Sequence, residues 1–173
     1  MANTLDSLIA KQDITELIYL YMRGLDRWDA DLMRSLFHDD AWCEYGFVNC
    51  GAHAFIDYCM GALATHAANH HFVGNILIDL EGDEAFGEVY FNAYHKIGGQ
   101  DGCEDVIIAG RYLDRYERRD GAWKFAYRSE RVDWSHTGPS NDPYFQLAPN
   151  GLVGARRGDA VYDRAARLKR HSS

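Results

Sequence analysis

The sequence predicts an α+β fold: a cone-shaped α+β barrel in which a curved antiparallel sheet is covered by N-terminal helices. Apolar residues recur at helical spacing over the first part of the chain, whereas four long strand patterns follow one another between residues 70 and 134. Helices followed by a meander of strands are typical of α+β proteins. A curved sheet covered by helices encloses a pocket, and small molecules bind in such pockets.

The first helix is predicted from an N-cap at Asn3 or Thr4 and an apolar stripe that runs from Leu5 to Leu25. Tyr21 falls on this stripe, so we expect its ring to be buried and its hydroxyl to need a partner. A second row of the same helix, Ile18 and Met22, leads at i,i+4 spacing to Asp26.

The next elements are shorter. Asp29 is expected to cap a second helix that runs to Phe37, residues 41–45 form a short strand, and Gly51 opens a third helix that reaches Leu63. Four strands then follow, at about residues 70–80, 84–97, 104–118 and 122–134. Asp120-Gly121 between the last two is the sharpest hairpin signal in the chain.

The whole chain, residues 1–173, is expected to be one domain with its core at about residues 5–134. Residues 135–150 have a loop-like composition with several apolar residues, which suits either a lid over the pocket or a strap on the surface. A last helix is expected over residues 158–169.

Composition excludes several classes of protein. The net charge of -8 argues against a nucleic-acid partner, which would need a basic surface. The four cysteines form no CxxC pair and are expected to be reduced. The N-terminus lacks the features of a signal peptide, and no apolar run is long enough for a membrane span. We therefore expect a soluble cytoplasmic protein with no membrane partner.

Metal, nucleophile and cofactor signals are weak. His66 and His70 have the i,i+4 spacing of zinc ligands on one helical face, but no third ligand accompanies them. The chain contains no GxSxG, GxGxxG or P-loop motif. We expect neither a metal nor a cofactor, which leaves acid–base chemistry by Asp, His and Tyr side chains.

His71 is the first candidate for that chemistry. It lies in the stretch His70–Asn75 at the start of the apolar run Ile76–Ile78, where a buried imidazole without a partner would cost about 1–3 kcal/mol. Asp26 is the best candidate partner, and a buried Asp–His pair is a candidate general base. The alternatives are an ordinary core or surface histidine and an Asp26 that lies in a loop after Gly24.

Strand alternation supplies two further candidates. His95 ends the small and apolar face of the second long strand, so it projects into the pocket if that face lines it. Arg131 shares a face with Trp123 and Phe125 in the last strand, so it is expected to point inward and bind an anionic or carbonyl oxygen. A bulge in that strand would reverse the second assignment.

Three motifs in this order resemble the SnoaL-like branch of the nuclear transport factor 2-like superfamily: Arg23-Gly24-Leu25-Asp26, His71-Phe72-Val73-Gly74 and the hairpin 116–125. The likeness extends from about residue 5 to residue 134. Within this branch the chain resembles scytalone dehydratase, bile acid 7α-dehydratase and hexachlorocyclohexane dehydrochlorinase. The resemblance implies a cystatin-like, cone-shaped fold and a reaction that needs no cofactor.

The resemblance also implies roles for particular residues. Asp26 and His71 correspond to the Asp–His dyad that removes a proton next to the bond being broken, and Tyr21 corresponds to a catalytic tyrosine. Tyr45 and His95 correspond to a tyrosine and a second histidine of scytalone dehydratase. Its serine and asparagine on the third long strand fall here on Gly110 and Tyr112, so we expect a substrate other than scytalone.

Together these observations predict a cofactor-independent, dehydratase-like lyase with catalytic residues Asp26, His71 and Tyr21, acting on a small hydrophobic aromatic or polycyclic substrate. The expected substrate-binding residues are Tyr45, His95, Arg131, Trp28, Asn75 and Tyr112. Alternatives are a retro-aldol carbon–carbon lyase or isomerase with the same dyad, and a non-catalytic ligand-binding protein or accessory subunit like the β subunit of ring-hydroxylating dioxygenases. We expect a homo-oligomer, a trimer rather than a dimer.

Overall fold

The computed structural model of the protein describes residues 4–99, 102–141, 143 and 147–163. The elements in chain order are α1 (Leu5–Arg27), α2 (Ala30–Ser35), β1 (Phe37–Glu44), β2 (Asn49–Gly51), α3 (Ala52–Ala64), β3 (His66–Glu81), β4 (Glu84–Gly99), β5 (Gly102–Arg119), β6 (Ala122–Pro139) and a 3₁₀ turn, η1 (Ala160–Tyr162). None of the described helices is long and apolar enough to cross a membrane.

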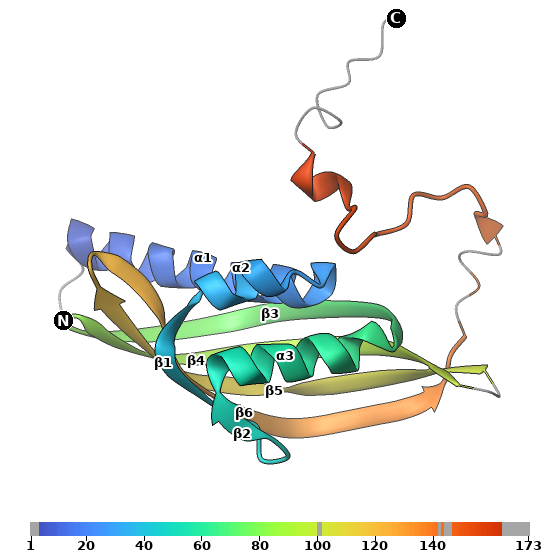
Figure 1. The fold of residues 1–173 in the computed structure, drawn as a ribbon, viewed down its shortest axis with the longest axis horizontal. Coiled ribbons are helices and arrows are strands. Elements are labelled where there is room, and N and C mark those ends of the chain that lie inside the picture. Colours follow the sequence, from blue (N-terminus) through green and yellow to red (C-terminus); the bar gives the residue numbers. More distant parts are fainter. Residues whose placement is uncertain (1–3, 100–101, 142, 144–146, 164–173) are drawn as a thin grey trace, which may run out of the picture.

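The strands form one curved sheet in the order β2-β1-β6-β5-β4-β3, and the helices α1, α2 and α3 lie over one of its faces (Figure 1). All neighbouring strands are antiparallel except β1 and β6, which run parallel. The predicted α+β fold is confirmed. The sheet stays open between its edge strands β2 and β3 and does not close into a barrel.

Helix α1 begins with a capping box in which Thr4 and Ser7 satisfy each other's backbone N–H groups. Its middle and C-terminal turns are buried against the sheet, as the apolar stripe predicts. The prediction is wrong for the first turns, because Leu5, Leu8 and Ile9 are exposed. The burial of α1 therefore increases toward its C-terminal end, where Asp26 lies.

The boundaries of several elements differ from the predicted ones. The second helix ends at Ser35 because Leu36 and Phe37 join β6, where the backbone N–H of Phe125 donates to the Leu36 carbonyl at 2.9 Å. The strand predicted at 41–45 therefore begins earlier, at Phe37. This parallel pairing joins residues about 90 apart in the chain, and local patterns carry no signal of it.

The long strands also extend beyond their predicted ends. Strand β3 begins at His66, so His71 lies within the strand and not at its start. Strand β6 runs to Pro139 and pairs there with Glu104, whereas the composition from residue 135 predicts a loop. The Asp120-Gly121 hairpin is confirmed, with positive φ angles of 52° and 80° at its two turn residues.

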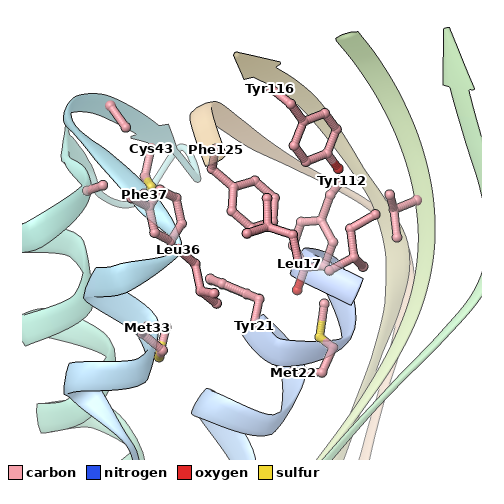
Figure 2. Close-up of a cluster of buried hydrophobic side chains, with 14 of the residues drawn as sticks. Leu17, Tyr21, Met22, Met33, Leu36, Phe37, Cys43, Tyr112, Tyr116 and Phe125 are labelled. Carbon is pink, nitrogen blue, oxygen red and sulfur yellow. The ribbon is translucent and has the colours of Figure 1, made fainter. Parts of the chain in front are cut away.

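The core between α1 and the sheet is rich in aromatic rings (Figure 2). Tyr21 lies edge-on to Phe37 and Phe125, whose rings stack with centroids 4.9 Å apart. The same core contains a fully buried ion pair, in which Arg128 on β6 donates to both carboxylate oxygens of Asp114 on β5 at 2.8 and 2.7 Å. A buried pair of this geometry satisfies both charges where water cannot.

Residues 155–159 contact the ends of α1 and α3, where Arg27 donates to Asp159 and Arg156 donates to Leu63. Arg156 donates to the carbonyl oxygens of Leu63 and His66 at 2.8 and 2.5 Å, and Tyr162 donates to Asp29 at 2.9 Å. The expected helix over 158–169 is present in the described residues only as the turn η1, and residues from 164 on lie outside the described part.

Candidate active site

A cavity of about 210 Å³ opens between the sheet and the helices α1 and α3. Most of its lining is apolar or aromatic, as in typical small-molecule sites. The lining residues are Tyr21, Leu25, Tyr45, Phe47, Phe55, Tyr58, Cys59, Ala62, Leu63, His66, His71, Phe91, Ala93, His95, Ile108, Tyr112 and Glu130.

His71 and Asp26 form a hydrogen-bonded pair at the edge of this cavity. The Nδ1 atom of His71 lies 2.7 Å from Oδ1 of Asp26, and the backbone N–H of His71 donates to both carboxylate oxygens at 3.1 Å. Only 6% of the His71 side chain and 10% of the Asp26 side chain are exposed. With the carboxylate ionised, Nδ1 carries the ring proton, and Nε2 has no hydrogen-bond partner among the described residues.

Local structure explains how the pair forms. Asp26 follows Ile18 and Met22 on the buried row of α1, so it reaches the sheet in the last turn of the helix. His71 stands opposite Ala93 on β4, and both residues line the cavity. The helix row and the strand face therefore converge from elements 45 residues apart.

Two tyrosine hydroxyls meet at the floor of the cavity. The Tyr21 and Tyr45 oxygens lie 3.1 Å apart, and the Tyr45 ring stacks on Phe55 with centroids 4.2 Å apart. Burial raises the pKa of both phenols far above their ordinary value. Both groups therefore stay protonated at physiological pH. One hydroxyl donates to the other, which leaves the pair one O–H for a ligand oxygen.

Arg128 packs among three aromatic rings of the core, Tyr21, Tyr112 and Phe125. Its guanidinium carbon is 4.2 Å from the ring centroids of Tyr21 and Tyr112 and 4.3 Å from that of Phe125. The buried cation favours negative charge nearby and so lowers the pKa of the Tyr21 phenol in opposition to burial.

A second cluster of polar side chains surrounds His95. The rings of His66 and His71 pack edge-on against His95, with centroids 5.0 and 5.2 Å away. The Asn69 side-chain oxygen is 2.9 Å from Nδ1 of His66 and 3.4 Å from Nδ1 of His95. Burial, followed by the neighbouring histidines, lowers the pKa of His95 to about 4. His95 is therefore neutral at physiological pH and suited to hydrogen bonding with a neutral ligand.

Two predicted site residues, Trp28 and Asn75, lie outside the cavity. Trp28 ends α1 in a left-handed conformation, and its Nε1–H donates to the Met60 carbonyl at 2.8 Å, so it joins α1 to α3. Asn75 lies on the opposite face of β3 because a bulge between Val73 and Ile76 reverses the alternation. The prediction that these two residues line the pocket is wrong.

The inward assignment of Arg131 is also wrong. Phe125 pairs with Tyr116, but Tyr127 pairs with Arg115, so Ala126 forms a bulge. The bulge turns Arg128 and Glu130 toward the core and cavity and leaves Arg131 exposed. Arg131 instead donates to the Glu130 carbonyl at 2.7 Å and to the Ser129 hydroxyl.

The predicted site did not include Arg128, Glu130 or His66. Glu130 and His66 line the cavity, and Arg128 packs on the rings of Tyr21 and Tyr112, which also line it. Arg128 and Glu130 depend on the β6 bulge, and His66 depends on a similar register shift before Ala68. His66 lines the cavity, whereas His70 is exposed and does not line it, so the two do not share a face. Within the described residues, no group of three His, Cys, Asp or Glu side chains is arranged to hold a metal ion.

A curved sheet covered by helices, with an Asp–His pair at the edge of an aromatic cavity, defines a class of small-molecule-binding α+β proteins. Comparison with protein families identifies which one. The SnoaL-like domain model matches residues 6–129, and the chain belongs to this family within the nuclear transport factor 2-like superfamily. No match was found among curated proteins.

Solved structures share the fold. A scytalone dehydratase-like protein of Novosphingobium aromaticivorans is 25% identical, with a TM-score of 0.68 over 78% of this chain and 93% of that chain. A hexachlorocyclohexane dehydrochlorinase of Novosphingobium barchaimii is 23% identical, with a TM-score of 0.70 over 78% and 93%. A cystatin-like protein of Nostoc punctiforme is 21% identical, with a TM-score of 0.62 over 77% and 96%.

Proposed function

We propose that this chain is a cofactor-independent lyase that eliminates water or a similar small group from a small hydrophobic aromatic or polycyclic substrate. The single observation that carries the proposal is the Asp26–His71 pair, joined at 2.7 Å and set at the edge of an aromatic cavity. Membership of the SnoaL-like family, together with structural neighbours named as dehydratase-like and dehydrochlorinase proteins, supports a lyase-type enzyme.

In this mechanism His71 is the general base. Asp26 accepts the Nδ1 proton and fixes the tautomer, so Nε2 is free to remove a proton from the substrate carbon next to the bond that breaks. The charge that forms on the imidazole is stabilised by the same carboxylate. General base catalysis of this kind contributes about 10²–10⁴-fold, and the remainder comes from orientation in the cavity.

Tyr21 and Tyr45 serve as the hydrogen-bond donors of the reaction. Both tyrosines line the cavity and remain protonated, and the Arg128 cation packs on the ring of Tyr21. One hydroxyl donates to the other, and the second donates to the oxygen on which negative charge develops when His71 removes the proton. Aromatic lining residues, including Tyr112 and Phe91, whose rings stack with centroids 4.4 Å apart, suit a flat hydrophobic substrate.

The geometry also favours an enzyme over a non-catalytic ligand-binding protein or accessory subunit. A protein of that kind has no need for an oriented imidazole and two protonated phenols at a single cavity. The elimination mechanism uses Tyr21, Tyr45 and His71 from the polar lining of the cavity. A retro-aldol carbon–carbon lyase or an isomerase would use the same base, so the products must decide between these reactions.

The protein is further proposed to act as a homo-oligomer, a trimer rather than a dimer. Phe72, Leu77 and Trp134 lie on the sheet with more than half of each residue exposed. Exposed apolar residues on one sheet are typical of surfaces that are covered in an assembly.

The proposal is tested by incubating the purified protein, without added metal or nucleotide, with a panel of hydroxylated aromatic compounds. Mass spectrometry then identifies products that have lost water, products that have lost formaldehyde, and isomers that have lost nothing. His71→Ala is expected to abolish turnover while the circular dichroism spectrum stays unchanged. Turnover retained in that variant would remove His71 from the mechanism.

A further inference from the structure

One carboxyl group in the cavity has no role in the mechanism described so far. Glu130 lies on β6 directly opposite Tyr112 of β5, and both residues line the cavity. No described residue forms a hydrogen bond or an ion pair with its carboxyl group. The group is therefore oriented toward the ligand space without a protein partner.

The surroundings of Glu130 favour its neutral form. Burial raises the pKa of Glu130 to about 7, although the Arg128 cation acts in the opposite direction. Arg128 is already neutralised by both oxygens of Asp114, so it does not form an ion pair with Glu130. Glu130 thus holds a transferable proton near neutral pH, the property that general acids require.

Glu130 and His71 approach the cavity from different sides. His71 is on β3 and Glu130 on β6, and β4 and β5 lie between them. Glu130 is in register with Tyr112 and Val89, four residues along β4 from Ala93, the partner of His71, so the two residues differ in position along the strands as well as across them. Both side chains nevertheless line one cavity. They are placed to act on different atoms of a single ligand.

We propose that Glu130 is the general acid of the elimination, and that the substrate carries a hydroxyl leaving group β to a carbonyl or an equivalent acidifying group. This inference rests on the proposed function. His71 takes the proton from the α carbon, the electrons of that bond form the double bond, and the bond to the β oxygen breaks. The departing oxygen takes the Glu130 proton and leaves as water. Proton return through solvent from the imidazolium to the Glu130 carboxylate completes the cycle.

The leaving group follows from this acid. Hydroxide is a poor leaving group and needs protonation as the bond breaks, whereas halide or carboxylate leaves without it. An acidic proton donor in the cavity would add nothing to the loss of a halide. The cavity is therefore suited to dehydration.

The ionisation of Glu130 is measured first, because it needs no substrate. Protein labelled with ¹³C at the glutamate carboxyl carbons is titrated by NMR, and the Glu130 signal is identified by its absence in Glu130→Gln. The proposal expects this signal to titrate near pH 7. A midpoint below about 5, the ordinary range of a glutamate, would overturn the proposal, because the Glu130 carboxyl would have no proton to donate at neutral pH.

The second measurement compares two probes that form the same enone: 4-hydroxy-4-phenylbutan-2-one and its 4-acetoxy derivative. In Glu130→Gln, kcat/KM is expected to fall by about 10²–10⁴-fold for the hydroxy ketone and by less than about threefold for the acetoxy ketone. Glu84→Gln, a carboxylate exposed at the start of β4, is the matched control and is expected to change neither.

Equal losses for both probes in Glu130→Gln would show a structural or binding role and would overturn the assignment. The proposed function fails in a different way. Turnover of the acetoxy ketone that survives His71→Ala would exclude the dyad, whatever the result at Glu130. The two variants therefore separate the base from the acid.

Discussion

The Nδ1 atom of His71 lies 2.7 Å from Oδ1 of Asp26, and the carboxylate also accepts the backbone N–H of the same histidine. A single carboxylate therefore holds both the ring and the main chain of its partner. The imidazole has little freedom to rotate, because both side chains are nearly buried. The proposed base is oriented before any ligand binds, which lowers the entropic cost of reaching a reactive geometry.

Asp26→Asn tests the role of the carboxylate. The amide keeps the shape of the side chain but cannot stabilise the imidazolium, and its NH₂ group favours the opposite tautomer of His71. We expect kcat to fall by about 10²–10⁴-fold with an unchanged fold, measured by turnover assay and circular dichroism. Asp31→Asn, at an exposed position in α2, is the control and should keep full activity.

Tyr21→Phe and Tyr45→Phe test the two donors. Each change removes one hydroxyl from the cavity and leaves the ring in place, so the loss should fall on kcat more than on KM. Removal of one donor to a developing oxyanion costs about 10²–10³-fold. Tyr19→Phe, on the exposed side of α1, should behave as wild type. Full activity in both cavity variants would exclude phenol donors from the mechanism.

Burial of Glu130 predicts a particular dependence of stability on pH. Its pKa is about 4.5 in the unfolded chain and about 7 in the folded protein, so the folded state holds a proton that the unfolded state loses. The stabilisation that the folded protein gains from the protonated Glu130 carboxyl is complete below pH 4.5 and is lost as the pH rises through 7. Between these two pH values, the free energy of unfolding of Glu130→Gln should rise relative to that of wild type by on the order of 1–3 kcal/mol.

Urea unfolding of both proteins at a series of pH values measures this difference. Glu84→Gln should instead follow the wild-type curve, because its carboxylate is exposed. A difference between Glu130→Gln and wild type that stays constant with pH would show that Glu130 has an ordinary carboxyl pKa in the folded protein.

The Arg128–Asp114 pair makes a prediction about stability. Arg128→Met leaves the Asp114 carboxylate buried without its cation, and loss of one partner of a buried pair costs about 3–5 kcal/mol. The double variant Arg128→Met/Asp114→Leu removes both charges and should recover part of this loss. Arg34→Met, which breaks the exposed pair with Asp57, should cost about 0–1 kcal/mol in the same chemical denaturation experiment.

Local patterns were sufficient to predict the parts of the site that depend on one regular element. The row Ile18, Met22 and Asp26 follows from helix geometry, and it places the carboxylate at the sheet. The alternation that assigns His95 to the cavity face follows from strand geometry, because β4 keeps its register with β5 throughout.

The remaining site residues depend on features that alternation cannot predict. Each bulge adds one residue to a strand and reverses the faces beyond it, which turns Arg131 and Asn75 outward and Glu130 inward. The parallel pairing of β1 with β6 is a long-range contact, so the start of β1 at Phe37 had no local signal. Errors in the predicted site are therefore concentrated beyond bulges.

The state of His71 tests the central claim most directly. Long-range ¹H–¹⁵N NMR spectra of ¹⁵N-histidine-labelled protein, with His71→Gln to assign the signals, report which ring nitrogen carries the proton. At a pH where the ring is neutral, the Asp26 contact predicts a protonated Nδ1 and a free Nε2, and Asp26→Asn should remove this preference. A wild-type His71 protonated at Nε2 would contradict the account, because the proposed base would have no lone pair facing the substrate.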